Sequence, residues 1–180
     1  MIHLTRSRLA ALLAGVSLLG GMLASLLSPA SALAAEPKHL GTFKDWNAFA
    51  AEEGGSKLCY MATQPKKSEY TGKGRGEVYL TVTHRPKENQ IGIVNVTAGF
   101  TFKPDSEAIM TIGKTTFKLY TSADGAWARD DKPVITAMKN GSVMTVKGAS
   151  AKGTQSFDTF SLAGMMGALG AINEACGIKN

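Results

Sequence analysis

Hydrophobic and polar positions alternate along short stretches of the chain, a pattern typical of half-buried β-strands. The clearest stretch is 77–83, where Val78, Leu80 and Val82 share one face and the residues between them share the other. Pro86 ends this strand, because proline has no N–H group to continue the ladder of a sheet. Similar runs predict further strands at 46–49, 57–63, 91–98, 108–112, 115–120, 125–129, 142–147 and 155–160.

Helical signals interrupt this pattern in two places. Asp130 or Asp131 is predicted to cap a short helix that runs to Asn140. Ser161 is predicted to cap a terminal helix over 162–175. The apolar stripe of that helix is predicted to consist of Leu162, Met165, Met166, Leu169 and Ile172. Many short strands, one short helix and a C-terminal helix together predict a mainly β, β-sandwich-like single domain.

Irregular structure is expected in two segments. Residues 35–41 are predicted to form a loose lead-in to the first strand. The segment 65–76 is predicted to be an exposed loop, because it contains three glycines and a proline. A short strand at 125–129, which contains Trp127, is predicted to lie at an edge of the sheet.

The N-terminal segment has the three parts of a secretory signal in the required order. Arg6 and Arg8 precede an apolar run over 9–27, and Pro29 and several small residues follow that run. An Ala-Leu-Ala sequence ending at residue 34 fits the small-x-small pattern that signal peptidase requires. A cut after residue 32, or an uncleaved membrane anchor, is the alternative.

We therefore expect residues 1–34 to be a signal peptide and residues 35–180 to be a single periplasmic or secreted bacterial domain. After cleavage the chain has no further segment long and apolar enough to span a membrane. The mature chain carries 18 basic and 14 acidic residues, a net charge of +4. This mild positive charge favours attraction to anionic polymers of the cell envelope. Nucleic acid is not an expected partner, because export separates the protein from it.

The mature chain contains two cysteines, Cys59 and Cys176. An even number of cysteines in an oxidising compartment predicts a disulfide bond between them. Two buried free thiols are the alternative. A bond would tie an early strand to the end of the last helix.

The sequence contains none of the motifs that mark nucleophile elbows, nucleotide-binding loops or zinc proteases. The mature chain has two histidines, His39 in the predicted lead-in and His84 at a strand end beside Arg85. We expect no catalytic residues, no metal site and no cofactor. A small hydrolase that uses His84 is the alternative, and it requires a carboxylate or hydroxyl partner beside this ring in a cleft.

Three features are candidates for binding a partner. The predicted loop at 65–76 has four cations that, with its glycines, suit an anion such as an acidic polysaccharide: Lys66, Lys67, Lys73 and Arg75. His84 and Arg85 are candidates to extend this anion-binding patch. Trp127, close to Arg129, is a candidate contact residue, because an exposed tryptophan in a short strand suits recognition.

Several short motifs follow one another in a specific order: Asp45-Trp46, Leu58-Cys59-Tyr60, Val78 to Pro86, Asp158 to Leu162 and Ala175-Cys176. Together they resemble the invasion associated locus B family of alphaproteobacteria. The resemblance extends from about Gly41 to Cys176. It implies a single β-rich envelope domain without known enzymatic activity, whose partner is an envelope component or a host surface. In some pathogens such proteins are linked to host-cell entry. A structural stabiliser of the envelope is a further alternative.

Overall fold

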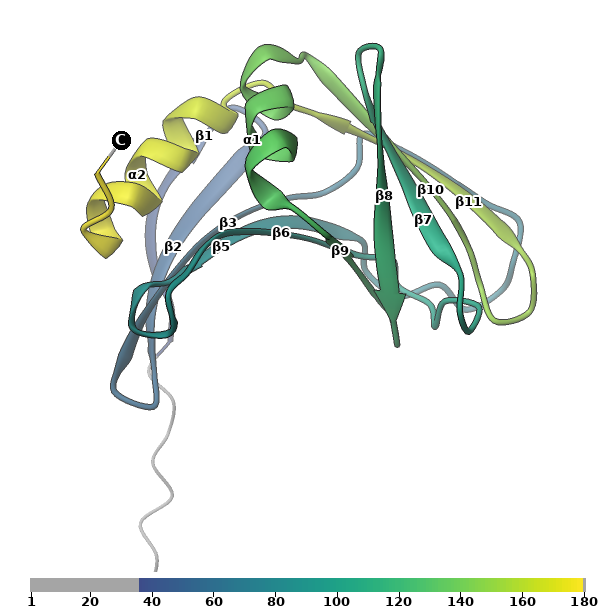
Figure 1. The fold of residues 1–180 in the computed structure, drawn as a ribbon, viewed down its shortest axis with the longest axis horizontal. Helices are drawn as coiled ribbons and strands as arrows, with labels where there is room; N and C mark the ends of the chain where they lie inside the picture. The colour runs from purple at the N-terminus through teal and green to yellow at the C-terminus, as the bar shows by residue number, and fades with distance from the viewer. Residues whose placement is uncertain (1–35, 180) are drawn as a thin grey trace, which may run out of the picture. The chain divides into compact units, whose positions relative to one another are not determined.

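The computed structural model of the protein describes residues 36–179, and the predicted signal peptide lies outside this range. Eleven β-strands, a short 3-10 helix and two α-helices make up the domain (Figure 1). In chain order the elements are β1 (Lys38–Phe43), β2 (Trp46–Glu53), β3 (Ser56–Thr63), β4 (Lys67–Tyr70), β5 (Tyr79–Arg85), η1 (Pro86–Glu88), β6 (Gln90–Thr97), β7 (Glu107–Ile112), β8 (Thr115–Ser122), β9 (Gly125–Ala128), α1 (Asp131–Asn140), β10 (Val143–Ala149), β11 (Gln155–Ser161) and α2 (Met165–Cys176).

All eleven strands belong to one antiparallel sheet in the order β1-β2-β3-β5-β6-β9-β8-β7-β10-β11-β4. The sheet bends so strongly that its two limbs lie opposite each other, with the helices on the inner side (Figure 1). The prediction of a mainly β, sandwich-like domain with one short helix and a C-terminal helix is confirmed. The strand pairing also shows that the two layers of the sandwich belong to a single sheet.

The two limbs meet at one end of the sheet. Strand β4 follows β3 in the chain but pairs with β11 at the opposite edge. Near this crossing, Lys66 donates its backbone N–H to the carbonyl of Thr159 at 2.7 Å. The indole of Trp46 donates to the carbonyl of Ser161 at 3.1 Å. The second contact holds the end of β11 against the start of β2.

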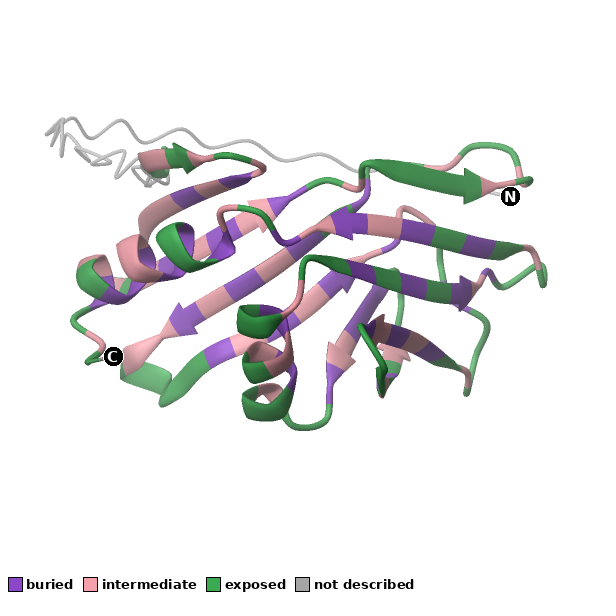
Figure 2. Ribbon diagram, turned by 90° about the horizontal axis from the view of Figure 1, so that it is seen from above, coloured by how far each residue is buried: buried purple, intermediate pink, exposed green. Residues whose placement is uncertain are grey.

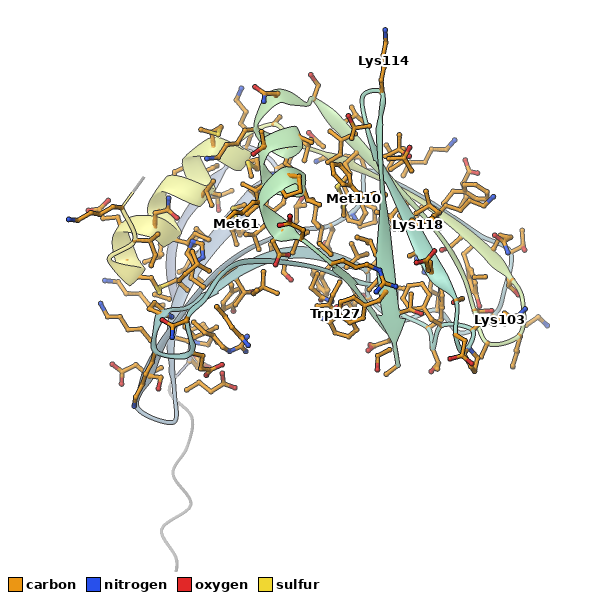
Figure 3. The ribbon with its side chains drawn as sticks, in the orientation of Figure 1. Met61, Lys103, Met110, Lys114, Lys118 and Trp127 are labelled. Carbon is orange, nitrogen blue, oxygen red and sulfur yellow. A yellow bond between two sulfur atoms is a disulfide. The ribbon has the colours of Figure 1, made fainter. Side chains whose placement is uncertain are left out.

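The inner face of the sheet forms the hydrophobic core. Side chains in a strand alternate between the two faces, and burial alternates with them along the strands (Figure 2). Met61 of β3 and Met110 of β7 lie on the inner side, whereas Trp127 lies on the opposite side of the sheet (Figure 3). We call the side away from the helices the outer face.

Both helices pack on the inner face. Helix α1 rests on β6 through Val134 and Met138, which are buried. The sequence left open whether Asp130 or Asp131 caps α1, and the structure assigns the cap to Asp130, which accepts the N–H of Lys132 at 3.2 Å. Asp131 instead accepts the N–H of Val94 in β6 at 2.8 Å, and burial raises the pKa of its carboxyl.

The predicted disulfide is present between Cys59 of β3 and Cys176 at the end of α2, with Cα atoms 6.0 Å apart. The two cysteines are separated by 117 residues. A cross-link that closes so long a loop restricts the unfolded chain and stabilises the fold by about 4–5 kcal/mol in the chain-entropy model. It fixes α2 on the sheet next to β2, β3 and β5.

Three predictions about irregular or edge segments were wrong. Residues 38–43, which overlap the lead-in expected at 35–41, form the edge strand β1, which hides little surface and therefore lacks a clear alternation. The segment 67–70, within the expected loop, forms the other edge strand, β4. Strand β9 lies between β6 and β8 rather than at an edge. Its four residues are too few to display the alternation of an interior strand.

The start of the terminal helix also differs from the prediction. Ser161 belongs to β11, and Gly164 caps α2 in the left-handed region with φ 90°. A Cβ atom on Gly164 would lie 1.8 Å from the carbonyl oxygen of Phe43, so only glycine permits this approach between α2 and β1. Met166, expected in the apolar stripe, is 56% exposed, because the buried face of α2 follows Met165, Leu169, Ile172 and Cys176.

Candidate binding surface

Arg75, one of the four predicted anion-binding cations, is part of the fold. Its Nη1 and Nη2 donate to the two carboxylate oxygens of Asp158 at 2.9 and 2.6 Å. Its Nε donates to the carbonyl of Ala98 at 2.8 Å. The side chains of Arg75 and Asp158 are only 11% and 2% exposed. Two parallel hydrogen bonds to a buried carboxylate make a strong, oriented pair, so this guanidinium is not available to an outside anion.

The environment of Arg75 explains why it folds inward. Its guanidinium lies 5.3 Å from the centre of the Tyr70 ring and 5.2 Å from that of Phe100. These two rings stack with their centres 5.1 Å apart. The hydroxyl of Ser68 donates to Asp158 at 2.7 Å, which satisfies a further position of the buried carboxylate. The arginine therefore anchors the glycine-rich segment to β11.

The three lysines of the segment 65–76 do not converge on one site. Lys66 pairs with Asp45, and the hydrogen bonds from Lys66 and then Ser161 lower the pKa of that carboxyl. Lys67 pairs with Glu69, whose hydrogen bond raises the pKa of the lysine. Lys73 is exposed. The four predicted cations do not form one cluster.

His84 and Arg85 do not extend a common patch either. The His84 ring is 2% exposed. Its Nδ1 accepts the N–H of Gly92 at 2.9 Å, and its Nε2 donates to the side-chain oxygen of Asn173 in α2 at 2.8 Å. Burial lowers the pKa of His84, so the ring is neutral at pH 7 and holds β5 and β6 to the helix. Arg85 turns away and pairs with Glu53 at 3.2 Å.

The other histidine, His39, lies in β1 rather than in a loose lead-in. Its Nε2 lies 3.4 Å from the side-chain oxygen of Asn47 and 3.3 Å from the hydroxyl of Thr42. The ring is tilted against Phe49 with centres 5.2 Å apart. Neither histidine has a carboxylate among these partners. Within residues 36–179, no group of three or more His, Cys, Asp and Glu side chains is arranged to hold a metal ion.

The structure places Trp127, the predicted contact residue, among other accessible polar and aromatic groups. Its ring lies over Gly125, where a Cβ atom would come within 2.2 Å of the indole. It stacks on Tyr120 of the neighbouring strand β8, with ring centres 5.6 Å apart and planes 21° apart. Tyr120 is 43% exposed. The pair forms an aromatic surface on the outer face.

Charged groups border this aromatic pair. The carboxylate of Glu107 accepts from Lys118 at 3.0 Å and from Arg129 at 3.2 Å. These two hydrogen bonds lower the pKa of Glu107. The guanidinium of Arg129 also lies 5.9 Å from the centre of the Tyr120 ring. The lysine and arginine side chains are 68% and 62% exposed, so they can meet a ligand from solution.

A second row of outer-face residues continues from Lys118 across the sheet. Lys118 of β8 lies opposite Ile109 of β7, which lies opposite Lys147 of β10, which lies opposite Phe157 of β11. Phe157 is 46% exposed, and Lys147 Nζ lies 5.2 Å from the centre of its ring. Neighbouring inward residues on the same strands are buried, among them Met110 and Val146.

We call six of these side chains the outer stripe: Trp127, Tyr120, Arg129, Lys118, Lys147 and Phe157. Of the six, the sequence singled out only Trp127 as a site residue. The alternation within 115–120 and 155–160 marks which residues face outward. It does not show that β8 and β11 lie three strands apart in one sheet.

Apart from the stripe, a groove of about 650 Å³ runs between α2 and strands β1 to β3. Its apolar lining comes from Leu40, Ala50, Ala51, Ala171 and Ala175. Lys57 at its rim donates to the carbonyl of Ala175 at 3.0 Å. None of the side chains predicted to bind a partner lines this groove.

Comparison with known proteins bears on this architecture. The family model described as "Invasion associated locus B (IalB) protein" matches residues 46–173. The chain belongs to this family. The IalB match covers β2 through most of α2 and thus the whole sheet except β1. The resemblance inferred from the sequence motifs is confirmed.

A solved structure shares the IalB fold seen here. The crystal structure of invasion associated protein b from Bartonella henselae superposes with a TM-score of 0.54 at 19% sequence identity. The alignment covers 75% of this chain and 95% of that chain. No curated protein matches the sequence significantly. IalB is not a known family of enzymes.

Proposed function

We propose that this IalB-family protein is an exported, non-enzymatic binding or adaptor domain that works in the periplasm or outside the cell. Its partner is a component of the envelope or, in a pathogen, of a host surface that is contacted during entry. The signal-like N-terminal segment and the family membership support this location. Within residues 36–179, neither α-helix has the length and apolar character that a bilayer crossing requires.

The observation that carries the proposal is the contrast between His84 and the outer stripe. His84, the residue best suited to acid–base chemistry in a hydrolase, is 2% exposed and bonded to Asn173 and to the backbone of Gly92. A general base must face its substrate and titrate near the working pH. Aromatic and cationic side chains, by contrast, gather where a partner can reach them. Aromatic residues and arginine are enriched at contact surfaces.

A comparison of cross-linked complexes in living cells tests this function. The tagged full-length protein is expressed in its native bacterium, cross-linked in intact cells and recovered from the envelope fraction. We expect a reproducible partner that is reduced by Lys118→Gln with Lys147→Gln but kept by the control Lys87→Gln with Lys114→Gln. The control removes the same charge from two exposed positions outside the outer stripe.

Enzyme assays complete this test. The purified protein is assayed against ester, amide and phosphate substrates beside His84→Gln. Turnover by the wild type that is lost in the variant would replace the binding function with a hydrolase. Recovery of no partner from the envelope would also overturn the proposal. Leakage of periplasmic contents from a deletion strain, without any partner, would favour a structural stabiliser of the envelope.

A further inference from the structure

We propose that the outer stripe is a binding site for an acidic polysaccharide. This inference rests on the function proposed above and names the class of ligand. The stripe crosses the outer face from Trp127 on β9 to Phe157 on β11. Arg129 and the two lysines lie between or beside the aromatic rings. It therefore offers planar apolar surfaces and positive charges in alternation.

The register of the sheet sets the length of this site. Tyr120 and Phe157 lie on strands β8 and β11, which are separated by β7 and β10. Three steps between neighbouring strands span about 14 Å. Between the two rings, Lys118 and Lys147 flank Ile109 on the strands to either side of it. Tyr120 and Lys118 lie two residues apart on β8, so a polymer that crosses the strands obliquely meets, in order, rings, two cations and a further ring.

The chemistry of an acidic sugar chain matches this order. A pyranose ring has an apolar C–H face that packs on an aromatic face, and its acidic substituent is an acceptor for lysine and arginine. Lys118 has two further N–H donors besides the one directed to Glu107. Arg129 likewise contacts Glu107 through one terminal nitrogen only. Both cations can therefore bind a second anion without breaking the pair that positions them.

Other macromolecules fit the outer stripe less well. A protein partner usually buries a continuous apolar centre with a polar rim. Here two lysines separate the stacked Trp127–Tyr120 pair from Phe157, so no continuous apolar centre lies along the outer stripe. Single-stranded nucleic acid also combines stacking with cations, but an exported protein does not meet it routinely. An acidic polysaccharide is therefore the envelope component whose charge and rings best complement the outer stripe.

Binding titrations with the purified mature protein test this site. The probes are polygalacturonate, alginate and heparin, with neutral dextran, an oligothymidylate and phosphatidylglycerol vesicles as comparisons. We expect at least one acidic polysaccharide to bind, with an affinity that falls as salt rises because the cations are exposed. Dextran should not bind. Binding to the oligothymidylate alone or to the vesicles alone would overturn the inference.

Matched variants distinguish binding at the outer stripe from binding through positive charge elsewhere on the protein. Lys118→Gln with Lys147→Gln should weaken binding about tenfold or more and reduce its salt dependence, whereas Lys87→Gln with Lys114→Gln should not. Tyr120→Ser with Phe157→Ser should weaken binding at high salt as well, because stacking is not screened. Ile91→Ser, at another exposed apolar position, is the control for that pair. Equal effects of the stripe variants and their controls would refute the site.

The two proposals fail in distinguishable ways. If the acidic polysaccharides do not bind but a cross-linked envelope partner persists, the ligand class is wrong and the adaptor function stands. If the polysaccharides bind and the stripe variants bind as tightly as the wild type, the site is wrong. Circular dichroism and the absence of free thiols in each variant establish that it is folded and oxidised.

Discussion

Two arginines in this protein form carboxylate pairs of the same chemistry with opposite consequences. Arg75 and Asp158 are almost completely buried and are linked by two hydrogen bonds. Arg129 and Glu107 are linked by one contact of 3.2 Å on the outer face, where the arginine is 62% exposed. The buried pair defines the path of a glycine-rich segment. The exposed pair places a cation beside an aromatic ring without using all of its donors.

The comparison shows that a run of basic residues in the sequence is a poor guide to an anion site. Lys66, Lys67, Lys73 and Arg75 are close in sequence, but Arg75 is used within the fold, and Lys66 and Lys67 form exposed pairs with two different acids. The cations of the outer stripe are scattered through the sequence and are brought together by strand pairing. Burial and geometry, rather than sequence proximity, decide which charges are free to meet a ligand.

Arg75→Ala removes the buried arginine pair and should have the largest effect on stability. Removal of one partner leaves the Asp158 carboxylate buried without its charge partner, which destabilises a protein by about 3–5 kcal/mol. Chemical denaturation followed by circular dichroism measures this loss. The double variant Arg75→Met with Asp158→Leu should recover much of it, because both charges are gone. A single variant as stable as the wild type would contradict the structural role.

Loss of the disulfide by Cys176→Ser should follow in size, at about 2–5 kcal/mol. The bond holds α2 on the inner face, opposite the outer stripe. Thermal denaturation of the variant beside the oxidised wild type measures the change. Binding of acidic polysaccharide below the melting transition should persist, because no stripe residue contacts the bond. Loss of binding in the folded variant would show that the two faces are coupled.

His84→Gln should destabilise by about 1–3 kcal/mol, because it disturbs two buried hydrogen bonds. The wild type should also lose stability as the pH falls below the ordinary histidine pKa of 6.5. The folded pKa is lowered, so the unfolded state binds the proton more readily and protonation favours unfolding. The loss levels off below the folded pKa. Denaturation midpoints between pH 8 and pH 5 should show this slope in the wild type and not in the variant.

Arg129→Ala removes the exposed arginine pair and should leave the denaturation midpoint within error of the wild type. Pairs between exposed side chains contribute little to folding, because water and salt screen them. The same variant should weaken binding of acidic polysaccharide, since the cation beside Tyr120 is lost. Lys114→Ala, at the tip of the β7–β8 hairpin (Figure 3), should change neither property. A marked loss of stability in Arg129→Ala would erase the distinction between the two arginine pairs.

Much of the fold follows from local pattern. Four interior strands bury every second residue, so β5, β7, β10 and β11 are visible as alternation. The hairpin turn at Gly113 and Lys114 and the cap of α1 are equally local. The edge strands β1 and β4 were missed, because an edge strand hides too little surface to require alternation.

The features that define the sites depend on distant contacts and were not predictable in the same way. The partner of Arg75 lies 83 residues further along the chain. The start of α2 is set by the carbonyl of Phe43 against Gly164, not by the residues around Ser161. The outer stripe needs the order of five strands, of which β9 is only four residues long. Trp127 was identified from the sequence, whereas its neighbours on the stripe were not.

The bond between Cys59 and Cys176 also imposes an order on biogenesis. The second cysteine follows the first by 117 residues, so it is synthesised later. Throughout that interval Cys59 is a lone thiol, open to mixed disulfides with other molecules. Oxidative closure must therefore wait until α2 has been synthesised, and a product that ends before Cys176 keeps Cys59 as a thiol. The bond therefore forms only in a chain that has been extended through α2.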